Sequence, residues 1–86
     1  MKKIVIDISQ VFFSAGGEKE FDEVEFRKEI NELVGFGENE VVITGYALIW
    51  VYLIALDELA TIAERVFYRS PQGGEDILVC DNIWEV

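Results

Sequence analysis

The stretch Val41–Leu56, VVITGYALIWVYLIAL, decides how this 86-residue chain folds. It begins as a continuous apolar run, passes through Gly45 and continues as an apolar segment of helical length. A run of this kind predicts a buried strand that a glycine turn joins to a buried helix. The stretch has 16 residues and is followed by Asp57–Glu58. Because a membrane span needs roughly 20 apolar residues, we expect no membrane segment.

The segments on either side supply the other elements of a single domain, residues 1–86. Ile4, Ile6 and Ile8 alternate with other positions and predict a strand over residues 3–8, which Val11–Phe13 continue after a bend. Asp22 and the helical spacing of the next apolar residues predict a helix. The remaining expectations, in chain order, are a turn at 15–17, this helix at 23–34 ended by Gly35, a linker at 37–40, strands at 41–43 and 66–68, a helix at 47–63, a turn at 70–74 and a strand at 77–80.

This order of elements predicts an α/β (α+β) fold: a mixed sheet of four or five strands with two helices, ferredoxin-like or similar. Each strand–helix–strand unit favours parallel neighbours, whereas the Gly73–Gly74 turn favours an antiparallel final pair. So short a chain buries only about 60% of its unfolded surface. The apolar helix after Gly45 therefore lacks neighbours within one chain, and we expect a homodimer that covers it.

The charge balance limits the partners. Seventeen carboxylates against seven cations give a net charge of −10, and binding to long nucleic acids depends on clustered Lys and Arg. We therefore expect no long nucleic acid as a partner. The chain has no histidine, and its single cysteine, Cys80, fits a reducing cytosol, so the expected location is cytoplasmic. No carboxylates have the spacing of a known metal site, so neither a metal nor a cofactor is expected.

Two loops are candidates for binding a small anion. At Thr44–Gly45–Tyr46, glycine allows a tight change from strand to helix and exposes backbone N–H groups at a helix N-terminus, where anions are stabilised. The second candidate is the loop from Arg69 to Gly74. On spacing alone, an ordinary tight turn and a hairpin turn are the commoner explanations of these two segments.

The pattern Ile43-Thr44-Gly45-x-x-Leu48-Ile49-Trp50, followed by Val66-Phe67-Tyr68 and then Gly73-Gly74, resembles a family of small CRISPR-associated ring nucleases from type III antiviral systems. Members of that family degrade the cyclic tetra-adenylate second messenger. The resemblance covers roughly residues 40–80. It implies a ferredoxin-like fold, a dimer that encloses the cyclic ligand, and ligand-binding residues in the two loops: Thr44, Gly45, Tyr46, Arg69, Ser70, Gln72, Gly73 and Gly74.

The chain departs from this family at its functional positions. Tyr46 stands where the family has an arginine, and Leu48 where it has a proline. The family's catalytic histidine, aspartate and second arginine correspond to Ala60, Arg69 and Pro71, which cannot activate a ribose 2′-hydroxyl. The resemblance therefore implies no catalytic residues, but a homodimeric binder of cyclic oligoadenylate in which Tyr46 stacks on an adenine.

Two rival functions stay open. Strong acidity and an apolar helix suit an acidic protein-interaction or inhibitor module that docks onto a basic protein surface without a nucleotide ligand. The other rival is residual enzyme activity through substitutes such as Arg65, Arg69 and Asp57, although these groups lie where the family has different chemistry.

Overall fold

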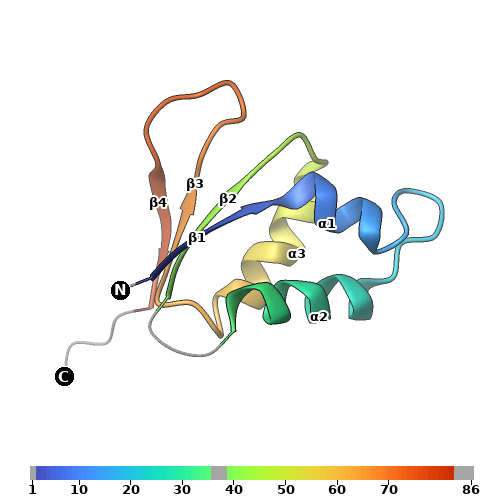
Figure 1. Ribbon diagram of the computed structural model, residues 1–86. Helices are drawn as coiled ribbons and strands as arrows, with labels where there is room; N and C mark the ends of the chain where they lie inside the picture. The colour runs from blue at the N-terminus through green and yellow to red at the C-terminus, as the bar shows by residue number, and fades with distance from the viewer. Residues whose placement is uncertain (1, 36–38, 83–86) are drawn as a thin grey trace.

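A four-stranded mixed sheet organises the fold, as a computed structural model that describes residues 2–35 and 39–82 shows (Figure 1). Its strands follow one another in chain order, so that each new strand is added beside the previous one. The first three strands are parallel and the last pair is antiparallel, which confirms the predicted class of fold. The strands are β1 (Lys2–Asp7), β2 (Asn39–Thr44), β3 (Arg65–Tyr68) and β4 (Ile77–Asp81).

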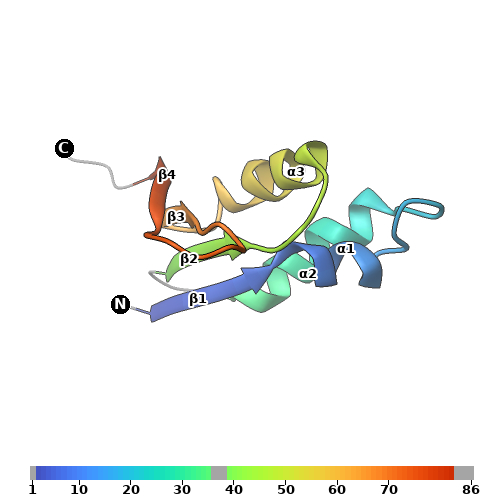
Figure 2. The same cartoon turned by 90° about the horizontal axis from the view of Figure 1, so that it is seen from above.

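Three helices, rather than the two predicted, connect the parallel strands. Two of them lie between β1 and β2 and the third lies between β2 and β3, all on one side of the sheet (Figures 1 and 2). This element order differs from the β-α-β-β-α-β order of ferredoxin-like folds, so the confirmed form of the prediction is a similar mixed sheet. The helices are α1 (Ile8–Ser14), α2 (Glu23–Val34) and α3 (Ile49–Leu59).

The predicted continuation of the first strand over Val11–Phe13 is wrong, because these residues belong to α1. The Asp7 side chain caps this helix: its Oδ1 accepts hydrogen bonds from the backbone N–H groups of Ser9 and Gln10. Ile8, Val11 and Phe12 are buried at helical spacing. The sequence therefore held both a cap and a helical pattern, which the apolar run Val11–Phe13 concealed.

The core lies between the sheet and the helices. β2 contributes Val41 and α2 contributes Phe26, both fully buried. In α3, the buried residues are spaced four apart and form one stripe, Val51, Ala55 and Leu59. The outer side of the first half of this helix is uncovered within the chain, where Ile49 is 79% exposed and Leu53 is 60% exposed.

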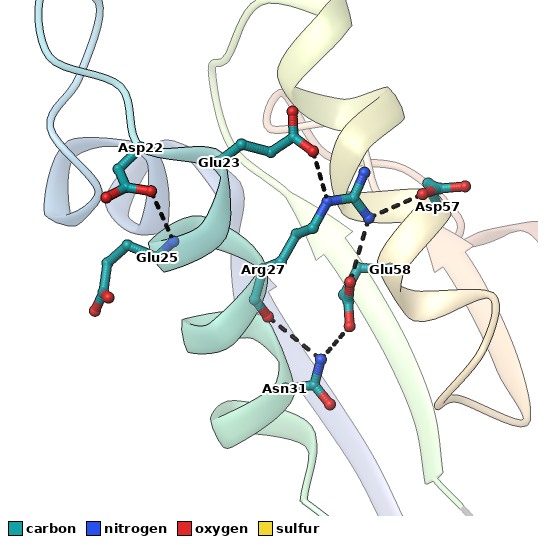
Figure 3. A network of polar contacts seen from close by, with 7 residues as sticks. All are labelled: Asp22, Glu23, Glu25, Arg27, Asn31, Asp57 and Glu58. Atoms are coloured by element: carbon teal, nitrogen blue, oxygen red, sulfur yellow. Dashed lines mark hydrogen bonds and ion pairs between the residues drawn. The ribbon is translucent and has the colours of Figure 1, made fainter.

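An ion-pair network joins α2 to α3 (Figure 3). The Arg27 guanidinium on α2 lies 2.8 Å from a carboxylate oxygen of Asp57 and 3.2 Å from one of Glu58, both on α3, and 3.0 Å from Glu23. The Asn31 amide also donates to Glu58. The hydrogen bond to Asp57, followed by those to Glu23 and Glu58, raises the pKa of Arg27. The network therefore orients the helices and engages a cation of α2.

Several predicted boundaries need correction. The second predicted helix, 47–63, is shorter, because α3 spans Ile49–Leu59. After the end of α3, the carbonyls of Ala60 and Ala63 no longer accept hydrogen bonds from a following helical turn. The Asn82 side-chain amide donates to both of them instead. In the predicted linker 37–40, residues 37–38 lie outside the described residues, while Asn39 and Glu40 begin β2. Among the described residues, no helix is long and apolar enough to cross a bilayer.

Candidate functional site

The predicted ligand residues lie at the carboxyl ends of β2 and β3, in two loops that face each other (Figure 1). Four of the eight, Gly45, Tyr46, Ser70 and Gln72, line a single open hollow of about 400 Å³. We call it the tyrosine hollow. Its complete lining is Gly45, Tyr46, Ala47, Tyr52, Tyr68, Ser70, Pro71 and Gln72.

Tyr52 and Tyr68 are lining residues that the sequence analysis missed. Their rings meet edge to face with centroids 5.6 Å apart, and the Tyr52 hydroxyl donates a hydrogen bond to the Gly45 carbonyl. Burial raises the pKa of Tyr52 to about 12, with smaller contributions from Tyr68 and Asp7. Nothing in the neighbouring sequence marks either tyrosine as a site residue, because each occupies an ordinary apolar position of its helix or strand.

The surroundings of Gly45 do not match an anion cradle. Gly45 has φ +108°, and a Cβ placed there would overlap Oδ1 of Asp7. The Asp7 carboxylate therefore lies directly against the turn, where its negative charge disfavours a second anion. In addition, α3 begins only at Ile49, so residues 46–48 separate the glycine from the N-terminus of the helix.

Arg69 does not line the tyrosine hollow. Its Nε and Nη2 donate to the two carboxylate oxygens of Asp76 at 2.7 and 3.0 Å, and Lys3 lies 3.3 Å from the same carboxylate. The hydrogen bond from Arg69 and the neighbouring Lys3 lower the pKa of Asp76, although burial opposes this shift. This charge-assisted pair engages the guanidinium that was predicted to bind the ligand.

The other three predicted residues, Thr44, Gly73 and Gly74, have other surroundings. The Thr44 hydroxyl donates to the Arg69 carbonyl at 2.7 Å and so joins the ends of β2 and β3. Gly73 and Gly74 belong to an exposed loop, and a Cβ at either one would have no neighbour within 4 Å. The structure therefore does not bring Thr44, Arg69, Gly73 or Gly74 into the lining of the tyrosine hollow.

A second hollow, which the sequence did not indicate, lies between α1 and the segment 46–48. It measures about 480 Å³ and has a mainly apolar lining: Phe12, Phe13, Glu18, Lys19, Tyr46, Ala47 and Leu48. The Trp50 ring lies beside it and packs edge to face against Phe12 and Phe21, with centroid distances of 5.7 and 5.1 Å. An aromatic cluster thus supports one side of this aromatic hollow.

Large exposed apolar side chains border the aromatic hollow. Phe13 of α1 is 74% exposed and Tyr46 is 72% exposed. With Leu48, Ile49, Trp50 and Leu53, which are also exposed, they form what we call the helical docking surface. A soluble monomer rarely exposes so many large apolar side chains together unless they serve an interaction.

A third hollow of about 400 Å³ lies between α1 and α2 and is acidic. Val11 and Leu33 contribute its apolar part, and Glu29 and Glu32 contribute carboxylates. The same hollow is bordered by Gln10 and Ser14. Among the residues described, no three His, Cys, Asp or Glu side chains are grouped so that they could hold a metal ion.

Comparison with known proteins adds no relative: no family model matches the chain, and no match was found among curated proteins or solved structures. The ring-nuclease resemblance therefore depends only on the residues quoted above.

Proposed function

We propose that the protein is an acidic interaction module, which binds a basic, apolar-anchored segment of another protein through its helical docking surface. The observation that supports this most directly is the exposure of large apolar side chains around the aromatic hollow, with Ile49 and Phe13 each about three quarters exposed. A nucleotide-binding site does not need this surface, whereas a protein partner that covers it removes apolar area from water.

The shape of the surface suits anchoring side chains. The aromatic hollow, at about 480 Å³, has room for one or two apolar side chains of a partner. Ile49 and Leu53 are spaced four apart on the outer side of α3 and extend the apolar contact along the helix. Buried aromatic and aliphatic anchors of this kind dominate the binding energy of many interfaces.

Charge selects the class of partner. Residues 18–32, which contain the loop beside the aromatic hollow and most of α2, hold seven carboxylates and three cations. One of those cations, Arg27, is already surrounded by Glu23, Asp57 and Glu58. The acidic hollow between α1 and α2 adds Glu29 and Glu32 as acceptors for a lysine or arginine. This potential attracts a basic segment and repels an acidic one.

The test uses two synthetic amphipathic helical peptides with the same Leu and Phe positions, one with Lys and one with Glu on its polar side. We expect the Lys peptide to bind in fluorescence anisotropy and the Glu peptide to bind at least about tenfold more weakly. The double variant Ile49→Gln/Leu53→Gln should weaken the Lys peptide about tenfold or more, because it removes two apolar contacts without changing charge or helix propensity.

A matched control is available on α2. Val24 is 78% exposed, almost the same as Ile49, but lines none of the three hollows. Val24→Gln should leave the affinity unchanged. Equal losses in Val24→Gln and in the double variant would mean non-specific adhesion to any apolar site, and the proposal would then be wrong.

Cyclic oligoadenylate binding by a homodimer is the second candidate. It is favoured by the tyrosine hollow, which collects Gly45, Tyr46, Ser70 and Gln72 and has tyrosine rings on which bases could stack. The candidate predicts that cyclic tetra-adenylate at about 100 times its dissociation constant adds about 2.7 kcal/mol of stability, without formation of a linear product. Tyr46→Ala should abolish this gain. An unchanged melting temperature with every ring size tested would remove the candidate.

A further inference from the structure

The side of the sheet that faces away from the helices has no cover among the described residues. Successive side chains of a strand point to opposite sides, and those of β2 illustrate the division: Val41 and Ile43 join the core, whereas Val42 lies on the other side. Val42 is paired with Val5 of β1 and Phe67 of β3, and Phe67 is in turn paired with Leu78 of β4. We call this side the open face (Figure 2).

The centre of the open face is apolar. Val42 is completely buried although no helix covers it, because its strand neighbours flank it on both sides. Val5 is 52% exposed and Leu78 is 47% exposed. The Lys3 ammonium lies 5.6 Å from the centre of the Phe67 ring, a distance at which a cation–π contact forms.

Ion pairs surround this apolar centre. At one end, Asp76 pairs with Arg69 at 2.7 Å, and Lys3, which lies in the strand register beside Glu40, reaches the same carboxylate at 3.3 Å. At the other end, Arg65 pairs with Glu40 at 3.2 Å and with Asp81 at 3.8 Å. The ion pairs of the open face therefore balance three cations against three carboxylates, although the chain carries −10.

From this arrangement we infer that the open face is the contact surface for a second copy of the chain. An apolar centre with a polar rim is the usual anatomy of a protein interface. Two chains of charge −10 repel each other over most of their surface, and they meet at least electrostatic cost where each is neutral. A strongly basic or acidic partner would gain no electrostatic advantage from binding at this face.

Sheet architecture points in the same direction. Parallel strands occur almost only in sheets that are covered on both sides, but the helices of this chain cover one side of β1–β3. Two open faces stacked on each other would bury Val5, Phe67 and Leu78 in a sheet-on-sheet contact about 10 Å thick. The predicted homodimer then forms through the sheet rather than through α3, and the helical docking surface remains available.

The test compares two double variants with the same change in charge. Val5→Lys/Leu78→Lys alters the open face, and Ile49→Lys/Leu53→Lys alters α3; each replaces two exposed apolar residues and makes the chain less negative. We expect sedimentation velocity to give the wild type twice the mass of a single chain of 9.8 kDa. Val5→Lys/Leu78→Lys should raise the dissociation constant of the dimer at least about tenfold relative to the wild type. Ile49→Lys/Leu53→Lys should remain dimeric.

Further measurements keep the inference falsifiable. Circular dichroism establishes that each variant is folded, and Val5→Thr/Leu78→Thr, which retains β-branched or strand-compatible side chains, should also weaken the dimer. A wild type that stays monomeric up to millimolar concentration overturns the inference. It is also overturned if the α3 variant dissociates and the open-face variant does not, or if hydrogen exchange shows new protection of the β4 backbone, which would indicate edge-to-edge pairing. None of these outcomes depends on peptide binding at the helical docking surface.

Discussion

The two sides of the sheet combine apolar surface and charge in different ways. On the helical side, exposed residues such as Ile49 and Phe13 adjoin a segment with an excess of carboxylates. On the open face, the apolar centre around Val42 is surrounded by equal numbers of cations and carboxylates. The net charge of the chain therefore does not describe the local charge of each of its surfaces. A strongly acidic chain retains one neutral surface, and the two sides suit different kinds of partner.

The largest effect is expected at Gly45, where the sheet passes into the segment that carries the helical docking surface. Gly45→Ala should lower the free energy of unfolding by about 3 kcal/mol or more, because the new Cβ meets the Asp7 carboxylate and the backbone has a left-handed conformation. Urea unfolding measures this loss. Gly73→Ala is the control: its φ of +102° is similar, but a Cβ there meets nothing within 4 Å.

Gly73→Ala should therefore cost only the conformational part, about 1 kcal/mol. Equal losses for the two substitutions would show that the contact between Gly45 and Asp7 has no energetic weight, and that the two sides of the molecule are not coupled through this turn.

The second prediction compares Val41 and Val42, which are adjacent, both fully buried and on opposite sides of β2. Val41→Ala should cost about 2–3 kcal/mol, because it removes two buried carbon groups and leaves a cavity between sheet and helices. Val42→Ala should cost about 1 kcal/mol in dilute solution, where neighbouring side chains and water can fill the space. Urea unfolding at rising protein concentration sharpens the comparison.

If the open face is a dimer contact, the cost of Val42→Ala should increase with protein concentration, since Val42 then lies within an interface. The cost of Val41→Ala should not change in this way relative to the wild type. A concentration-independent cost for both variants would argue that the open face remains exposed to water.

The sequence predicted the elements correctly where several local patterns indicated the same structure. The helix 23–34 was predicted with its observed limits, because an Asp22 cap, an amphipathic period and Gly35 all indicate the same element. The parallel pairings followed from the strand–helix–strand units, and the antiparallel pairing followed from the Gly73–Gly74 turn. α1 was missed because the apolar run Val11–Phe13 also fits a strand and conceals the Asp7 cap and the helical spacing of the buried residues.

The candidate site was less predictable, because its properties depend on tertiary contacts. Nothing adjacent in sequence indicates that Asp7 lies against Gly45 or that Arg69 pairs with Asp76 across the loop. Likewise, the charge balance of the open face arises only after four strands bring distant residues together, as Arg65 and Glu40 illustrate. The family resemblance grouped the two loops into one site, but nothing in the sequence indicated which of their side chains are already engaged.

Salt should act differently on the two surfaces, which is the third prediction: it should weaken binding at one and leave it unweakened at the other. Raising NaCl from about 0.05 to 0.5 M should weaken binding of the Lys peptide at the helical docking surface about tenfold, because screening reduces attraction to the carboxylates. Self-association should strengthen or stay constant, since screening reduces repulsion between chains of charge −10 while the contact itself is neutral. Anisotropy and sedimentation measure the two responses. A dimer that dissociates in salt would contradict the assigned neutrality.

The smallest expected effect concerns Tyr52, which lies on the helical side and donates to the Gly45 carbonyl. Tyr52→Phe should cost about 1 kcal/mol through loss of this hydrogen bond, without changing the dimer mass. Burial raises the pKa of Tyr52 to about 12 from the ordinary value of 10.0. The unfolded chain therefore loses this proton first, and the stabilisation present below pH 10 disappears as pH rises toward 12. Between those values the wild type should lose stability faster than Tyr52→Phe in urea unfolding. Parallel slopes would mean that Tyr52 titrates as an exposed tyrosine and that the tyrosine hollow admits more water than its packing suggests.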